Sequence, residues 1–162
     1  MPLSASSSRV TVGPAPGGRG LFTATPVAAG GLLFELDGVF RGGPDRYSIQ
    51  VDVASHLHPR PEQFAQGEAA DVPWWFLNHS CRPTVWIDGL RVIAVRDLAV
   101  GEQLSFDYDS TEWSLDAPFR CGCGECDGRT VRGYAHLDAD GRAARAGRVA
   151  SHLRRLAGHG NA

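Results

Sequence analysis

Apolar and polar residues alternate over short stretches along much of the chain, the period of half-buried β-strands. The clearest pattern spans residues 84–95, where two apolar runs flank an Asp-Gly pair at 88–89 and predict a β-hairpin. Residues 32–40 carry an Asp-Gly pair at 37–38 between apolar runs and predict a second hairpin. Further short strands are predicted over 9–12, 20–25, 47–53 and 103–108.

Two stretches depart from this pattern. Residues 54–73 are polar and rich in proline, which predicts a loop with one helical turn beginning at Pro61. Residues 142–157 are rich in Ala and Arg and have apolar residues at helical spacing, which predicts a C-terminal helix with its arginines on a solvated face. The fold class predicted is mainly β (α+β), with little parallel βαβ character.

Length and composition narrow the class of protein. A chain of 162 residues with 43% hydrophobic and 21% charged residues suits one domain with a packed core. The net charge of -2 argues against direct nucleic-acid binding, which needs a basic face. No apolar run is long enough for a membrane span, and residues 1–20 lack the apolar core of a secretory signal, so we expect a cytoplasmic protein without membrane contacts.

All 16 basic residues are arginine, and the chain contains no lysine. A GC-rich genome explains this composition best, and we expect a bacterial origin. One chemical consequence follows: a protein of this sequence that acted on lysine side chains would have none of its own to modify.

The four cysteines predict a structural zinc site. Cys121, Cys123 and Cys126 form a C-x-C-x-x-C cluster, and Cys81 is the fourth cysteine of the chain. Four thiolates complete the tetrahedral shell of a structural zinc ion, so we expect one zinc that ties a distant loop to the C-terminal segment. Such binding would contribute folding free energy directly.

Other uses of these cysteines fit the sequence less well than zinc does. Disulfides would allow three pairings, but a cytoplasmic location disfavours them, and a bridge between Cys121 and Cys123 would be strained. Redox-active thiols lack the βαβ context that usually surrounds them. His79 and Asp127 are possible substitute ligands for the metal.

Three polar motifs stand out beside the cysteines. The first is Gly18-Arg19-Gly20 at the start of a strand, the second is the stretch from Phe76 to Pro83 (FLNHSCRP), and the third is the stretch from Gly101 to Tyr108 (GEQLSFDY). Taken singly, each has an ordinary structural explanation: a glycine turn, a polar turn and a strand that ends in a tyrosine. Their order along one chain is more specific than any of them alone.

Together with the cysteine cluster, these motifs resemble the SET-domain protein lysine methyltransferases that carry a zinc-binding post-SET segment. The resemblance covers about residues 17–137. It implies a fold of short twisted sheets in which the C-terminal strand threads the segment around Asn78 to Cys81 as a pseudoknot. The divisions implied are a flexible segment 1–16, a SET domain 17–116, a post-SET zinc segment 117–137 and a helical tail 138–162.

The resemblance also implies the activity and the methyl donor, S-adenosylmethionine, with the side-chain amine of a lysine in a protein or peptide as acceptor. Tyr108 matches the catalytic tyrosine, and Phe106 matches a position that influences how many methyl groups are added; a phenylalanine there favours more than one. The remaining roles follow by position. The methyl donor would meet Gly18, Arg19, Gly20, Tyr47, Asn78 and His79, and zinc would bind Cys81, Cys121, Cys123 and Cys126.

Some positions depart from the family pattern. Trp75 stands where an arginine is often found, Thr84 stands where an asparagine is common, and the cysteine cluster is shorter than the usual C-x-C-x₄-C form. These departures bear on how the methyl donor is bound. Two alternative functions stay open: a non-catalytic module of this fold that binds the methyl donor or a peptide, and a methyltransferase that acts on a small molecule.

Overall fold

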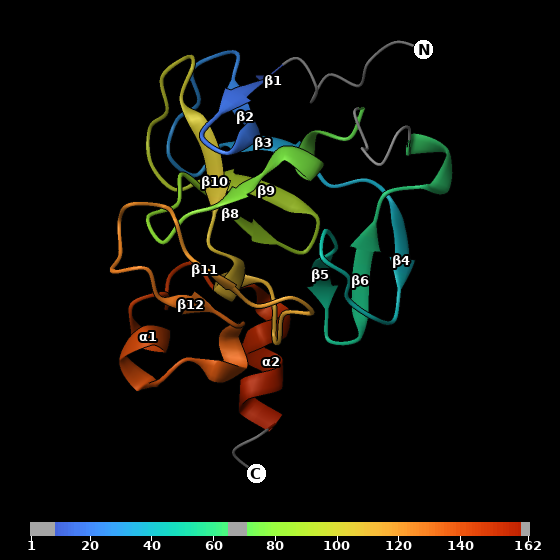
Figure 1. Ribbon diagram of the computed structural model, residues 1–162, viewed down its shortest axis with the longest axis vertical. Coiled ribbons are helices and arrows are strands. Elements are labelled where there is room, and N and C mark those ends of the chain that lie inside the picture. Colours follow the sequence, from blue (N-terminus) through green and yellow to red (C-terminus); the bar gives the residue numbers. More distant parts are fainter. Residues whose placement is uncertain (1–8, 65–70, 160–162) are drawn as a thin grey trace.

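The computed structural model describes residues 9–64 and 71–159. Its largest sheet has four strands in the order β1-β2-β10-β7 (Figure 1). Strands β1 (Val10–Ala15) and β2 (Gly18–Thr23) form an antiparallel hairpin, and β10 (Gln103–Phe106) pairs antiparallel with β2. The other edge of β10 pairs in parallel with the short strand β7 (Asn78–His79). Two of the sequence motifs therefore lie side by side.

The second sheet contains the clearest predicted element. Strands β8 (Val85–Asp88) and β9 (Arg91–Ala94) form the hairpin expected over residues 84–95, and β3 (Leu32–Glu35) joins the other edge of β9. The two-residue turn contains Gly89, whose positive φ of 59° is a conformation that glycine adopts at little cost. The alternation of buried and partly exposed residues along β8 is the one that the sequence predicts.

The third sheet shows that the hairpin predicted over residues 32–40 is wrong. Strand β4 (Val39–Arg41) pairs not with β3 but with β6 (Ser55–His58), which pairs in turn with β5 (Ile49–Asp52). Between β3 and β4 the chain crosses from one sheet to the next, and the Asp37 carbonyl accepts a hydrogen bond from Trp74 Nε1 at 2.9 Å. The Asp-Gly pair marks a change of sheet because this tertiary contact outweighs the local turn preference.

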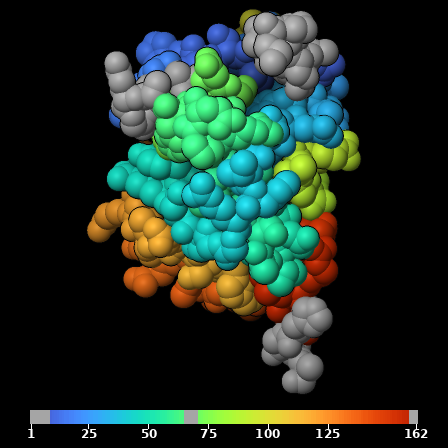
Figure 2. All heavy atoms as spheres, turned by 90° about the vertical axis from the view of Figure 1, so that its right-hand side faces the viewer, coloured from blue at the N-terminus to red at the C-terminus, as the bar shows by residue number. Residues whose placement is uncertain are grey.

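The stretch predicted as a loop contains a strand. Residues Ser55–His58 form β6, the central strand of this sheet, and the helical turn expected at Pro61 is present as the 3-10 helix η2 (Pro61–Gln63). The sequence did not predict this strand because His56 and His58 are polar residue types, although both are buried in the structure. Figure 2 shows this face of the molecule, with the chain of β4 to β6 at its centre.

The C-terminal part forms a separate layer, below the first two sheets and beside the third (Figure 1). It begins with the 3-10 helix η4 (Tyr108–Ser110) and continues through the strand pair β11 (Phe119–Arg120) and β12 (Thr130–Val131). The single predicted helix is wrong in its bounds, since α1 (Ala139–Ala143) and α2 (Ser151–His159) are separated by residues 144–150. The other 3-10 helices are η3 (Pro73–Phe76) and η5 (Tyr134–His136).

Two apolar clusters form the core. The large one joins the three larger sheets and includes Leu21, Leu33, Leu57, Ile87 and Leu104, each no more than 1% exposed. The small one lies in the C-terminal layer, where Tyr134, Val149 and Leu153 are buried together. The fold is thus mainly β with few short helices, as predicted. None of the described helices is both long enough and apolar enough to cross a bilayer.

Candidate active site

Tyr108 lies at the end of the last central strand, where β10 passes into η4. Asp107 caps η4 by accepting a hydrogen bond from the Asp109 backbone N–H at 3.2 Å. The Tyr108 hydroxyl donates to the Leu77 carbonyl at 3.0 Å. Burial raises the pKa of the Tyr108 phenol, so the phenol keeps its proton at neutral pH and its oxygen is held in one place.

Three hollows meet around Tyr108. The first, here called the polar cavity, has a volume of about 410 Å³ and is bounded by Pro16, Asn78, His79, Ser80, Gln103, Ser105, Tyr108, Phe119, Gly122 and Cys123. The second, the inner cavity, has about 50 Å³ and is bounded by residues 44–49 together with Trp74, Trp75, Leu77, Phe106, Tyr108, Glu112, Leu115 and Asp116. The third, the outer hollow, has about 370 Å³ and shares much of the inner cavity's boundary, including Tyr47 and Tyr108. Tyr108 therefore borders all three.

The alternation of side chains along β10 separates the two cavities. Gln103 and Ser105 border the polar cavity, whereas Phe106 borders the inner cavity and Leu104 is fully buried in the large core. Successive side chains of a strand point to opposite faces, so the sequence Gln-Leu-Ser-Phe supplies a polar wall on one side and an apolar wall on the other. The Phe106 and Tyr108 rings then lie 4.7 Å apart between their centroids.

Asn78 and His79 reach the polar cavity from β7, beside β10. Asn78 Nδ2 donates to the Arg19 carbonyl at 3.1 Å. The His79 ring accepts a hydrogen bond at Nδ1 from the Tyr108 backbone N–H at 3.2 Å, and its Nε2 lies 3.5 Å from Cys81 Sγ. Burial lowers the pKa of His79 to about 4, so the ring is neutral and ties the tyrosine segment to the cysteine cluster.

The glycine motif lies next to the polar cavity rather than in its wall. The Gly18–Gly20 segment contacts the site through Asn78, and a Cβ at Gly20 would come within 2.9 Å of Gln103 Nε2. Gly20 thus leaves room for a side chain that borders the cavity. Tyr47 is further away, since it borders the inner cavity and the outer hollow, where its ring stacks on Trp75 with centroids 4.2 Å apart. A contact between Tyr47 and the methyl donor stays a prediction.

Buried charges fix the segment that carries Tyr108. Asp107 and Asp109 are 2% and 0% exposed, and each meets an arginine of the C-terminal layer. Arg145 Nε donates to Asp107 Oδ2 at 2.5 Å, and Arg129 donates from Nη1 to Asp109 Oδ2 at 2.6 Å. The Gly133 backbone N–H completes the set by donating to Asp109 Oδ1 at 2.8 Å.

This network corrects one prediction. Arg145 does not lie on a solvated helix face, because the chain between α1 and α2 turns it inward and leaves it only 9% exposed. A buried carboxylate pair flanking a tyrosine needs compensating charge, and the arginines supply it. The sequence carried a signal that was missed: two aspartates in the apolar context of Phe106 and Tyr108 are unlike a solvated strand end.

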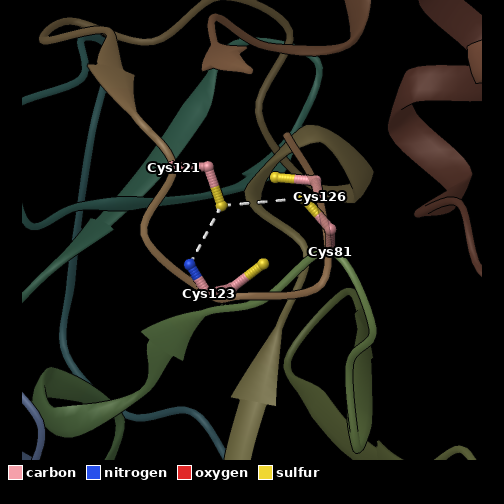
Figure 3. Close-up of side chains that lie close together, drawn as sticks. All are labelled: Cys81, Cys121, Cys123 and Cys126. Atoms are coloured by element: carbon pink, nitrogen blue, oxygen red, sulfur yellow. Dashed lines mark hydrogen bonds between the residues drawn. The ribbon is translucent and has the colours of Figure 1, made fainter. Parts of the chain in front are cut away.

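The four cysteines come together as predicted, and their sulfur atoms lie within 4.8 Å of one another. Figure 3 shows Cys121, Cys123 and Cys126 on one loop, with Cys81 reaching in from the segment after β7. All four are free thiols, and the sulfur atoms of Cys81 and Cys121 are 3.7 Å apart. A tetrahedral zinc ion with bonds of about 2.3 Å would separate its sulfur ligands by about 3.8 Å, so the cluster fits a metal.

The cluster is joined to the tyrosine segment by one side chain. Arg129 donates from Nε to Cys81 Sγ at 3.2 Å while its Nη1 contacts Asp109. Burial raises the pKa of the Cys81 and Cys121 thiols, which a bound cation would counteract by favouring the thiolate. The substitute ligands proposed from sequence are not needed, since four sulfur atoms complete the shell.

The polar cavity suits a ligand with polar ends and an aromatic ring. Its volume falls in the range of small-molecule sites. Amide and hydroxyl groups come from Asn78, Gln103 and Ser105, and aromatic surface comes from Tyr108 and Phe119. The sequence motifs pointed to Asn78 and Tyr108 but not to Gln103, Ser105 or Phe119. The polar positions of the β10 alternation were the available signal for Gln103 and Ser105, and no comparable signal marks Phe119 on β11.

The comparisons with known proteins show the family of the chain. Residues 18–109, more than half of the chain, match the SET domain family, and the chain belongs to that family. Methyltransferase flvH of Aspergillus flavus is 45% identical over 53 residues, which is 30% of this chain and 30% of that protein.

Two further relatives carry the name histone-lysine N-methyltransferase, H3 lysine-36 specific. The proteins of Aspergillus oryzae and Schizosaccharomyces pombe are each 36% identical over 58 residues, or 31% of this chain. The matched segment covers 6% of the first and 7% of the second. All three alignments thus span under a third of the relatives' own length, and all three relatives are named as methyltransferases.

Proposed function

We propose that the protein transfers methyl groups from S-adenosylmethionine to the side-chain amine of lysine in a protein or peptide. The observation that carries the proposal is the position of Tyr108, which borders both the polar cavity and the inner cavity. Methyl transfer to an amine is an in-line displacement that requires two reactants on opposite sides of the transferred group. Membership in the SET domain family supports the choice of reaction.

The residues around the polar cavity would bind the methyl donor. Asn78, Gln103 and Ser105 offer amide and hydroxyl groups to its polar ends, and Phe119 offers a ring face. The bound cofactor would supply an electrophilic methyl group on a sulfonium. Arg19 contributes its backbone carbonyl to the orientation of Asn78.

The inner cavity would take the alkyl chain of the target lysine. Trp74, Trp75, Leu77 and Phe106 line it with apolar surface. This apolar part of the wall excludes water, and desolvation lowers the pKa of an amine beside it. Tyr108 would orient the amine nitrogen through its hydroxyl.

Zinc is the metal that we assign to the cysteine cluster. Four thiolates in tetrahedral reach and no open position define a structural rather than a catalytic site. Its role here is to hold Cys123 and Gly122, which border the polar cavity, against the segment after β7 (Figure 3).

The first experiment measures binding of S-adenosylmethionine by isothermal titration calorimetry, followed by methyl transfer to a panel of lysine peptides. The chain contains no lysine, so any methyl-lysine detected by mass spectrometry comes from the added substrate. Binding without transfer would favour the non-catalytic module, and transfer to a free amine in place of peptides would favour a small-molecule enzyme. Absence of binding would contradict the proposal.

The variant Tyr108→Phe tests the role of the hydroxyl. We expect transfer to fall by about 10²-fold or more, the loss that follows removal of one positioned polar group at a reacting centre. Calorimetry should show that binding of the methyl donor persists. Transfer at the wild-type rate would remove the assigned role.

Phe106→Tyr tests the control of the number of methyl groups. Phe106 is 4% exposed and borders the inner cavity beside Tyr108, so an added hydroxyl would occupy space and present a hydrogen-bonding group there. We expect mono-methyl product to increase at the expense of higher states, measured by mass spectrometry at the end of the reaction. An unchanged product distribution would contradict it.

A further inference from the structure

Glu112 is a buried acid that borders the inner cavity, and neither its sequence context nor the family motifs point to it. It follows η4, and its backbone N–H donates to the Tyr108 carbonyl at 2.9 Å. The two side chains therefore lie on one short turn and border the same cavity. Only 4% of Glu112 is exposed, so little solvent reaches its side chain. A polar group of a ligand in that cavity could therefore contact the carboxyl group in place of water.

The two carboxyl oxygens of Glu112 differ in their surroundings. Oε1 accepts hydrogen bonds from the Gln50 backbone N–H at 2.9 Å and from Thr111 Oγ1 at 3.4 Å. Oε2 lies 4.0 Å from His56 Nδ1, beyond hydrogen-bonding distance. That nitrogen is buried and has no hydrogen-bond partner within the described residues. Oε1 thus anchors the side chain, while the contact given for Oε2 is the longer one to His56.

The anchor itself is rigid. Gln50 is 3% exposed, and its side-chain oxygen accepts a hydrogen bond from the Trp113 backbone N–H at 2.8 Å. Strand β5 and the chain after η4 are therefore tied together on both sides of Glu112. A carboxyl group held this way keeps its position when a charge enters the cavity.

The proposed reaction requires that the target lysine lose a proton, and no residue has yet been assigned to accept it. A lysine side chain has an ordinary pKa near 10.4 and reaches the cavity mainly as an ammonium ion, which has no electron pair to offer. Burial raises the pKa of Glu112 to about 8, close to the pH at which an enzyme usually works. A base performs best when its pKa lies near the working pH.

We propose that Glu112 accepts the proton of the target ammonium ion. The proposal rests on the function proposed above. One N–H bond of the ammonium breaks, an O–H bond forms at Glu112 Oε2, and the electron pair stays on nitrogen. That pair then forms the N–C bond with the methyl carbon while the C–S bond breaks and its electrons remain on sulfur. The proton on Glu112 leaves to solvent when the product departs.

Several other ionisable groups face this site and belong in the analysis of any pH profile. His56 on β6 is closest to the carboxyl group, and His152 on α2 contacts the Thr111 carbonyl at 2.7 Å. The other ionisable groups border the inner cavity with Glu112. They are Tyr108 on η4, Asp45, Arg46 and Tyr47 between β4 and β5, and Asp116 between η4 and β11. Burial lowers the pKa of both His56 and His152, so these two are neutral where Glu112 titrates.

The test is Glu112→Gln, which keeps the size of the side chain and an oxygen for the Gln50 N–H. We expect kcat to fall by about 10² to 10⁴-fold near pH 8, the usual contribution of a general base. In the wild type, kcat should increase with pH as Glu112 ionises. In the variant, the midpoint of this increase should shift to higher pH, towards the pKa of the amine. Glu35→Gln, an exposed acid on β3, is the matched control and should keep both the rate and the profile.

Peptide binding separates a proton acceptor from a merely structural residue. We expect Glu112→Gln to weaken binding of a lysine peptide while leaving unchanged the binding of the same peptide with norleucine, which has no amine. Equal loss for both peptides would indicate that the cavity has collapsed and would overturn the assignment. Equal rates and pH profiles for variant and wild type would overturn it as well.

A stability measurement gives a readout that needs no substrate. The folded-state pKa of Glu112 lies above its unfolded value, so the stability gained by burying the neutral acid is complete below about pH 4.5 and is lost as pH rises to about 8. Urea unfolding should show the wild type losing stability relative to Glu112→Gln across this window. A constant difference would show that Glu112 does not titrate there. If the wild type transfers no methyl group, both proposals fail; if it is active and the variant matches it, only this one fails.

Discussion

The layer of larger sheets and the C-terminal layer are stabilised by different interactions. The sheets surround one large apolar cluster, in which Leu21, Leu57 and Leu104 are fully buried. The C-terminal layer has only a small cluster and depends on buried ion pairs, in which Arg129 and Arg145 meet two aspartates, and on the four cysteines. Apolar burial tolerates changes of pH and metal content, whereas the second set of interactions responds to both.

Tyr108 lies at the boundary between these layers. Strand β10 positions it from the first, and the ion pairs of Asp107 and Asp109 position it from the second. The candidate active site therefore depends on both layers, and perturbing the C-terminal layer should disturb the site while the sheets stay folded.

The largest expected effect follows loss of the metal. Cys121→Ser removes one of four ligands, and structural zinc sites contribute on the order of 10 kcal/mol of apparent binding free energy. We expect about one zinc per wild-type chain and loss of that zinc in the variant. In the variant, amide hydrogen exchange should be fast over β11, β12 and the loop between them, and should stay slow in β8 and β9.

Asp127→Asn is the matched control, because Asp127 lies in the same loop, is exposed and is not one of the four clustered ligands. It should keep the zinc and the exchange pattern. A metal-free wild type with slow exchange throughout would contradict the assignment of a structural site.

A smaller effect is expected from the ion pairs. Arg145→Ala leaves Asp107 buried with less compensating charge, and breaking a buried pair in this way typically costs about 3–5 kcal/mol. Urea unfolding should show this loss, and methyl transfer should fall because Tyr108 is no longer held. Arg154→Ala, an exposed position on α2, should change stability by less than about 0.5 kcal/mol. Equal stability of the two variants would show that the network contributes little.

The smallest effect concerns the attachment of α2. His152 is 2% exposed and its ring contacts the Thr111 carbonyl at 2.7 Å. Burial lowers its pKa, so the stability it contributes is present above its ordinary pKa of about 6.5 and is lost as pH falls below that value. We expect the urea midpoint of the wild type to fall between pH 7.5 and pH 5 by more than that of His152→Gln. The same fall in both would assign the acid sensitivity to other groups.

Local patterns predicted the elements whose contacts are local. The hairpin of β8 and β9 follows from alternation and a glycine turn, and both are properties of neighbouring residues. The hairpin expected over residues 32–40 failed because β3 and β4 find partners far along the chain. The break between α1 and α2 was missed for a similar reason, since Arg145 leaves the helical pattern to reach Asp107.

The site was predicted in part. The cysteines and the motifs around Asn78 and Tyr108 were found because their residue types are rare and their order is specific. The residues outside the recognisable motif positions were missed: Gln103 and Ser105 were predicted only as part of a strand, and Glu112 was not singled out. Their burial arises from packing between layers, which no short window of sequence records.

The polar cavity takes lining from Pro16, near one end of the chain, and from Gly122 and Cys123 in the last third. A ligand bound there would contact both layers. Its binding free energy would be lost whenever either layer unfolded, so the ligand would stabilise both. Without ligand, heating should melt the two layers in separate transitions. With ligand at saturation, the two transitions should merge into one. The number of calorimetric transitions without ligand therefore reports how many units of the protein unfold independently.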